Sequence, residues 1–168
     1  AALLEAANFK NAAGTNVENI VLTNTGAGNN TFNAALVTGA KNVKATVGVA
    51  GDTQTVSNLA SLATSVELAG KGNLTATTTA TLTGTADVVA LKLSGAGTSA
   101  TVRSAVDIGN TNAIEGVTIA ATGTNFVNLT AGTANKSITV TGDGALNIAG
   151  PANAGLIGDA TNNAFTYD

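Results

Sequence analysis

The sequence predicts an all-β protein, and within that class a repetitive β-solenoid (β-helix) of about six turns with about 23 residues each. Short runs rich in Thr, Val and Asn alternate apolar and polar residues, which is the pattern of half-buried strands. These runs recur at a nearly constant interval and are separated by glycines. Aromatic residues make up only 3% of the chain. A thin core between closely stacked strands is therefore expected.

The first residues differ from the rest of the chain. Leucines and alanines at helical spacing predict a short helix in residues 1–13 that ends before Gly14, so residues 1–15 are expected to form an N-terminal helix or cap. The β-repeat domain is expected over residues 16–150. Residues 151–168 are expected to be a boundary segment that leads into a further β element, because the chain stops in a strand-like run. The 168 residues are accordingly expected to be a piece of a longer protein.

The repeat is clearest in the apolar centres of four runs, which are each 23 residues apart: Ile20, Val43, Val66 and Val89. A second apolar residue follows each of them two positions later, so one face of each run is apolar. The four side chains are predicted to stack in a single inward column. Two later runs continue the series, at Val117/Ile119 and Ile138/Val140.

Each unit contains a second strand-like run, 8–13 residues later in most units. These second runs are centred on Phe32, Val56, Leu74, Val102, Val127/Leu129 and Leu146/Ile148. Two short strands and two glycine-containing corners suit one turn of a solenoid. A β-sandwich is the alternative, because it also has strands every 8–12 residues. A sandwich core usually contains more large side chains than this chain provides.

The composition argues against several classes of function. The chain has no His and no Cys, and thus no imidazole, thiolate nucleophile or disulfide. Its seven Lys and Arg residues are scattered singly, which argues against nucleic-acid binding, and no apolar run is long enough for membrane insertion. An enzyme is not expected. Few charges, no Cys and a sequence pI of about 4.7 favour an exported bacterial protein.

Three carboxylates lie beside glycines in turn-like contexts: Asp52, Asp143 and Asp159. They are the candidate metal ligands, and the metal would be calcium, which takes carboxylate and carbonyl oxygens on tight bends. The simpler alternative is that each Asp caps a turn. Glu18 and Glu115 occupy similar repeat positions, so repeat geometry explains them better than a pair of catalytic acids.

The repeat units resemble the repeat regions of bacterial S-layer proteins and of related secreted glycine/aspartate-repeat (RTX-like) surface proteins. The segments that carry the resemblance are Val17–Leu22, Ala40–Val43, Ile114–Val117, Thr139–Leu146 and the final Gly158–Asp168. The resemblance covers most of residues 16–168, and it implies a β-helical wall element of an extracellular lattice that calcium orders.

The expected function is therefore a structural one. The chain is predicted to be a self-assembling cell-surface protein, either an S-layer lattice segment or a subunit of an extracellular filament, whose main partner is itself. The alternative is an adhesin stalk or a module that binds a cell-surface glycan or a host surface. Either function would place the chain outside the cell, at the cell surface.

Overall fold

A computed structural model of the chain describes residues 17–35, 37, 39–109, 114–131 and 137–149, together with the backbone of residues 164–167. The helix expected over residues 1–15 and most of the expected boundary segment 151–168 lie outside this part. Within the described ranges, regular structure consists of strands alone.

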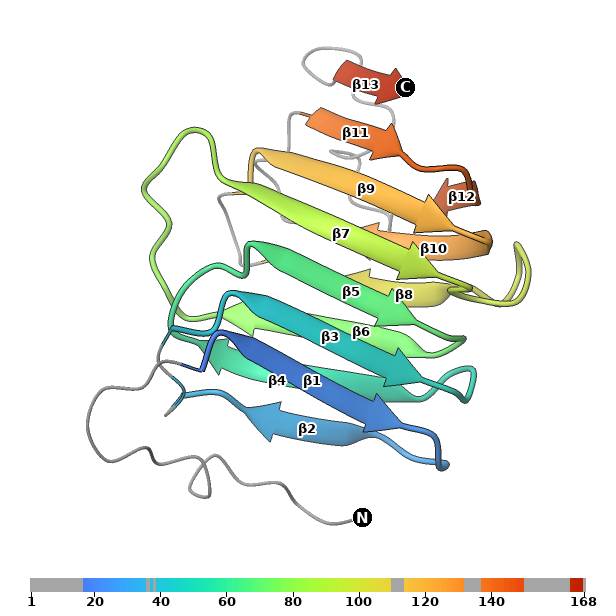
Figure 1. The fold of residues 1–168 in the computed structure, drawn as a ribbon, viewed down its shortest axis with the longest axis horizontal. Helices are drawn as coiled ribbons and strands as arrows, with labels where there is room; N and C mark the ends of the chain where they lie inside the picture. Colours follow the sequence, from blue (N-terminus) through green and yellow to red (C-terminus); the bar gives the residue numbers. More distant parts are fainter. Residues whose placement is uncertain are drawn as a thin grey trace.

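The chain alternates between two layers of strands, and Figure 1 shows the strands of each layer following one another from the N-terminal to the C-terminal end. One layer, sheet A, contains β1 (Asn19–Asn24), β3 (Asn42–Val47), β5 (Ser65–Ala69), β7 (Val88–Ser94), β9 (Gly116–Thr122), β11 (Ser137–Thr141) and β13 (Ala164–Tyr167). The other layer, sheet B, contains β2 (Asn30–Asn33), β4 (Thr53–Leu59), β6 (Asn73–Thr78), β8 (Ser104–Asp107), β10 (Thr124–Thr130) and β12 (Ala145–Ala149).

The pairing of the strands confirms the β-solenoid and excludes the sandwich. Neighbours within a sheet lie two elements apart along the chain, and all of the pairs are parallel. Each turn therefore places one strand in sheet A and the next in sheet B before returning one level higher. Parallel strands require a crossover connection, and here the crossover is the strand in the opposite sheet.

The inward column of sheet A matches the prediction for its first three members and differs at the fourth. Ile20 pairs with Val43, and Val43 pairs with Val66. Val66, however, pairs with Leu91, while Val89 pairs with Val117. All of these residues are buried, Val66 to 1% exposure. The prediction that Val89 continues the column of Val66 is thus wrong by two residues, and a two-residue shift keeps the same side chains inside.

The shift has a local cause. The connection from β6 to β7 spans residues 79–87, whereas the connection from β4 to β5 spans only 60–64. When the connection from sheet B back to sheet A differs in length, the sequence spacing between stacked residues changes. The same face of the strand still points inward.

The second strand of each turn forms where predicted in five of the six units. The exception is the unit assigned to Val102, which lies outside the strand with 45% of its surface exposed. The strand begins at Ser104, and its inward apolar residue is Val106, at 1% exposure. Alternation in this stretch is too short to distinguish Val102 from Val106, so the prediction for Val102 is wrong.

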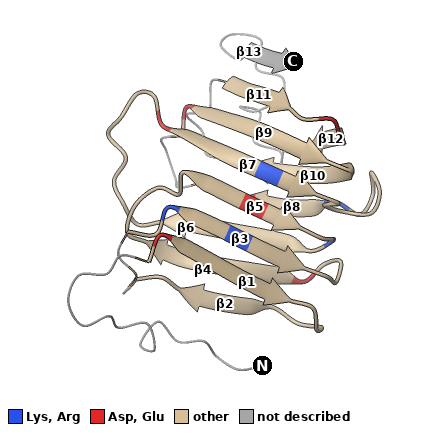
Figure 2. Cartoon of the chain, in the orientation of Figure 1, with Lys and Arg blue, Asp and Glu red and all other residues tan. Residues whose placement is uncertain are grey.

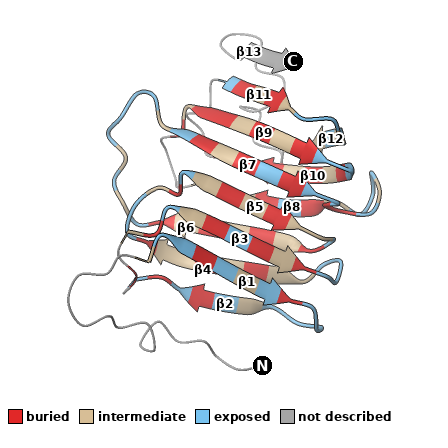
Figure 3. Cartoon of the chain, in the orientation of Figure 1, coloured by how far each residue is buried: buried red, intermediate tan, exposed pale blue. Residues whose placement is uncertain are grey.

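The core is an apolar layer between the two sheets, made of the inward side chains of both. Figure 3 shows the buried positions as bands along the strands. Its largest fully buried side chains are leucines, isoleucines and valines, and the space between Leu59, Val66 and Val89 is too small for a water molecule. Among the described side chains, Phe32 is the buried aromatic residue of this layer, at 4% exposure. Small β-branched residues suit a layer this thin, because they pack closely on a pleated surface.

Glycines form the corners where the chain leaves sheet A. A glycine with positive φ directly follows β5, β7, β9 and β11: Gly70, Gly95, Gly123 and Gly142. Other residues rarely adopt this backbone conformation. The glycines between the strand-like runs therefore mark the sharp bends that send the chain into sheet B.

Candidate functional site

The candidate calcium ligand Asp52 lies at the corner between β3 and β4, and its carboxylate is engaged within the fold. Its Oδ2 accepts a hydrogen bond of 2.8 Å from the backbone N–H of Gly28, one turn below. Its backbone carbonyl accepts a further bond of 2.7 Å from the N–H of Asn73, one turn above. Asp52 therefore links three successive turns at one corner, which is a structural role.

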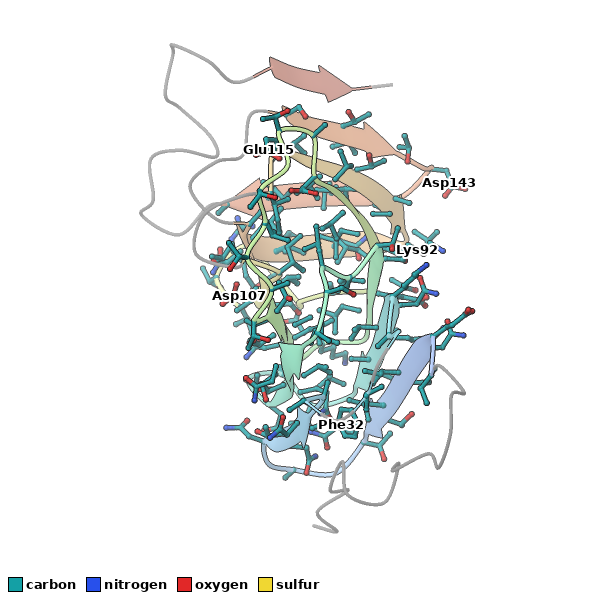
Figure 4. The ribbon with its side chains drawn as sticks, turned by 90° about the vertical axis from the view of Figure 1, so that its left-hand side faces the viewer. Phe32, Lys92, Asp107, Glu115 and Asp143 are labelled. Atoms are coloured by element: carbon teal, nitrogen blue, oxygen red, sulfur yellow. The ribbon has the colours of Figure 1, made fainter. Side chains whose placement is uncertain are left out.

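The candidate ligand Asp143 lies at the corresponding corner between β11 and β12, where it is exposed (Figure 4). Four turns separate it from Asp52, or roughly 20 Å at the usual spacing of strands, so the two carboxylates do not converge. Asp159 lies outside the described residues. Among the side chains that the structure places, no three acidic, His or Cys residues gather into a possible metal site. Calcium binding at these corners stays a prediction.

Two carboxylates that the sequence did not single out together, Asp87 and Glu115, lie at the opposite end of the sheet A strands. Glu115 Oε2 accepts a hydrogen bond of 2.8 Å from the backbone N–H of Asp87. The N–H groups of Glu115 and Gly116 in turn donate to the carbonyl of Asp87. Asp87 Oδ2 is buried and has no hydrogen-bond partner among the described residues.

This pairing corrects the expected equivalence of Glu18 and Glu115. The register of sheet A places Asp87 beside Glu115, because Val88 pairs with Gly116. Both acids come one residue before their strands, and this shared position is the sequence signal that would have identified the pair. The 97-residue spacing between Glu18 and Glu115 does not preserve register across the connection of residues 79–87.

Asp107 is a single carboxylate on the outer face of sheet B, at the end of β8. Burial raises its pKa above the ordinary value, and a 2.9 Å hydrogen bond from the N–H of Gly109 opposes this by lowering it. Its in-register neighbours, Thr75 and Thr130, are uncharged. The adjacent strands therefore place no cation beside this carboxylate that would offset the effect of burial on its pKa.

A shallow groove of about 350 Å³ crosses the outer face of sheet A, and we call it the outer groove. Its walls are two rows of outward side chains from successive strands. One row is Asn19, Asn42 and Ser65, and the other is Val21, Lys44, Glu67 and Lys92. Ile20 and Val43 lie between the rows. Because each row crosses the strands, the groove runs along the axis of the solenoid.

The charges of the outer groove alternate along one row. Figure 2 shows them as a basic, an acidic and a basic position on β3, β5 and β7. Lys44 Nζ lies 2.7 Å from Glu67 Oε1, and both side chains remain partly exposed. Lys92 is exposed and forms no ion pair or hydrogen bond within the described part of the chain. Figure 4 shows Lys92 on the outside of the solenoid, on the face opposite Asp107.

The other wall of the groove is polar and uncharged. Asn42 Nδ2 donates a hydrogen bond of 2.8 Å to Asn19 Oδ1 of the preceding turn. This amide stack leaves two side-chain groups available to a ligand, the amide oxygen Oδ1 of Asn42 and the hydroxyl of Ser65. Neither has a hydrogen bond in the described structure.

The first strand of sheet A has a free edge among the described residues, because β1 pairs there with β3 alone. The carbonyls of Glu18 and Asn24 accept hydrogen bonds from the neighbouring turn, so the even-numbered positions of β1 face β3. In a parallel ladder the backbone groups of alternate residues point to opposite sides. The N–H and C=O groups of Asn19, Val21 and Thr23 therefore point away from the solenoid.

Comparison with known proteins provides no family assignment: no family matches the chain, and neither a curated protein nor a solved structure is similar to it. The described residues contain no helix of the length and hydrophobicity needed to cross a membrane.

Proposed function

We propose that this chain is a non-catalytic structural element of a bacterial cell surface that self-associates into a lattice or filament, as an S-layer segment or filament subunit. The observation that carries the proposal is the edge of β1, which pairs with β3 alone among the described residues and presents a row of backbone donors and acceptors on its other side. Such an edge pairs readily with another strand. A parallel stack can be extended by a second copy without any change in its geometry.

The outer surface offers little resistance to this association. The net charge is −3 over 168 residues, and salt screens repulsion of this size at physiological ionic strength. At the edge itself, Val21 is 63% exposed, an apolar side chain where soluble proteins often place a charge. End-to-end contact between unlike edges does not close on itself, so it produces filaments rather than discrete oligomers.

Light scattering over a range of protein concentrations, with and without calcium, tests the proposal. The average mass of the wild-type chain should rise with concentration. Val21→Pro removes one outward N–H without touching the bonds to β3, so it should reduce association while leaving the fold intact. Val21→Thr is the matched control, because it keeps the N–H group and the β-branched shape and should associate like the wild type.

Two results would contradict the proposal. One is a wild-type chain that stays a monodisperse monomer at millimolar concentration whether or not calcium is present. The other is equal association of Val21→Pro and wild type, which would show that the β1 edge is not the contact. The first result would favour the alternative function, a module that binds a surface glycan, which the outer groove supports independently.

A further inference from the structure

The outer groove is elongated and runs along the solenoid axis. Each of its two rows takes one residue from each successive turn, so similar outward positions recur about every 4.8 Å along the axis. A linear polymer with a short repeat can therefore make comparable contacts with β1, β3, β5 and β7 in succession. An irregular globular partner would not exploit this periodicity.

The groove carries a local excess of positive charge in an acidic protein. Its walls contain two ammonium groups and one carboxylate, whereas the whole chain has a net charge of −3. The ion pair between Lys44 and Glu67 uses one of the ammonium groups. Lys92 is left without a partner among the described residues, at the end of the row. An anionic group on the ligand is the complement of this free cation.

The remaining groove chemistry favours a carbohydrate over other polymers. Amide and hydroxyl groups line the opposite wall, at Asn19, Asn42 and Ser65, and they suit the hydrogen-bonding groups of sugars. An extended peptide usually pairs with the edge of a sheet, whereas this groove crosses the face, where the backbone groups are already paired. A nucleic acid would require more cations and aromatic stacking groups than these walls provide.

We propose that the outer groove binds a linear acidic polysaccharide, with carboxylates on its sugars, that lies along the axis of the solenoid. Lys92 binds a sugar carboxylate directly. Lys44 binds a second one when it exchanges its contact with Glu67 for the ligand. The amide and hydroxyl row holds the sugar hydroxyls. This inference does not depend on self-association, because the groove lies within a single chain.

Affinity electrophoresis in gels that contain polygalacturonate tests the proposal, with mobilities normalised to gels that contain no polysaccharide. The wild-type chain should be retarded by polygalacturonate and not by the neutral polymer dextran. Lys92→Gln should weaken binding about twofold to fivefold, the range for one exposed charge contact. Glu67→Gln should strengthen binding, because it removes the carboxylate and frees Lys44.

Two controls carry the same charge changes at exposed corners outside the groove. Lys71→Gln matches Lys92→Gln, and Asp143→Asn matches Glu67→Gln. Both should bind like the wild type. Thermal melts of all four variants should coincide with the wild type, because the substituted side chains lie on the surface.

Three outcomes would overturn the proposal. The first is wild-type mobility that polygalacturonate leaves unchanged. The second is equal retardation by dextran, which would remove the requirement for a carboxylate. The third is an equal effect of Lys71→Gln and Lys92→Gln, which would mean that overall charge, and not the groove, controls binding.

Discussion

Gly70 lies directly against Val47 of the preceding turn, so that a β-carbon at Gly70 would stand 2.5 Å from the Val47 carbonyl oxygen. Gly70 also has a φ of 92°. Two separate requirements, a positive φ and close approach of stacked corners, therefore select glycine at this position. The corner spacing of the solenoid depends on this contact, because a side chain here would push the two turns apart.

Substitutions of three corner glycines should separate these two requirements. Gly70→Ala violates both, and it should lower the free energy of unfolding by more than about 2 kcal/mol. Gly95→Ala violates only the positive φ, since no atom lies within 4 Å of its β-carbon position, and should cost about 1 kcal/mol. Gly26→Ala meets neither obstacle and should be nearly neutral. Denaturant unfolding measures all three, and equal costs would contradict the stacked corners.

A charge in the inward column should unfold the chain far more readily than the same charge on the outer face. Val66→Asp buries a carboxylate without a partner in the middle of the stack, where Val66 is 1% exposed. The loss should exceed roughly 3 kcal/mol. Val21→Asp places the same residue at an exposed site of sheet A and should change the stability by less than about 0.5 kcal/mol. Similar melting temperatures for the two variants would show that Val66 is not in the core.

Asn125 should be the most costly polar residue to remove, because its fully buried amide joins three turns. Its Oδ1 accepts a hydrogen bond of 3.0 Å from the N–H of Ala96, and its Nδ2 donates to the carbonyls of Thr122 and Ala145. Asn125→Ala leaves the buried N–H of Ala96 without a partner and removes the bonds to the two carbonyls, and it should cost about 2–4 kcal/mol. Asn128→Ala, at a half-buried position with no such bonds, is the control, and an equal loss there would contradict this role.

The raised pKa of Asp107 predicts a stability that depends on pH in a defined direction. Burial makes the folded chain hold this proton more tightly than the unfolded chain, so ionisation above the folded pKa reduces stability. Asp107→Asn keeps an acceptor for the N–H of Gly109 and removes the charge. It should therefore raise stability at pH 7 by less than about 1 kcal/mol, because the site is partly exposed. The gain should disappear by about pH 3, where the wild-type carboxyl is protonated.

Melts of Asp107→Asn and wild type over this pH range measure the difference. A gain that grows as the pH falls would reverse the expected sign and would show that the carboxylate is stabilised by the fold. Asp143→Asn removes the same charge at an exposed corner and is the control; its stability at pH 7 should stay close to that of the wild type.

Much of the fold follows from local pattern, and the exceptions have a physical explanation. Alternation identifies the inward face correctly at Val66 and at Val89, because a strand exposes its side chains with a period of two. It does not determine that Val66 lies beside Leu91, since a shift of two residues leaves the same face buried. Register depends on the length of the intervening connection, which carries no periodic signal.

The candidate sites were harder to predict for a related reason. The turn context makes Asp52 a candidate calcium ligand, but it does not reveal the hydrogen bond to Gly28, which joins two turns across 24 residues of sequence. The outer groove combines Asn42, Glu67 and Lys92 from three turns, and each is an ordinary surface residue within its own segment. In this solenoid the candidate sites combine residues from different turns. Which residues lie side by side can be predicted only when the register between the turns is known.

Electron microscopy of the purified chain, with and without calcium, shows whether the solenoid self-associates. We expect filaments or ordered arrays in which the solenoid axes are aligned, so that their diffraction contains a strong spacing of about 4.8 Å along the direction of stacking. Val21→Pro should shorten or abolish them. Isolated particles under all conditions, or arrays without that axial spacing, would contradict the account.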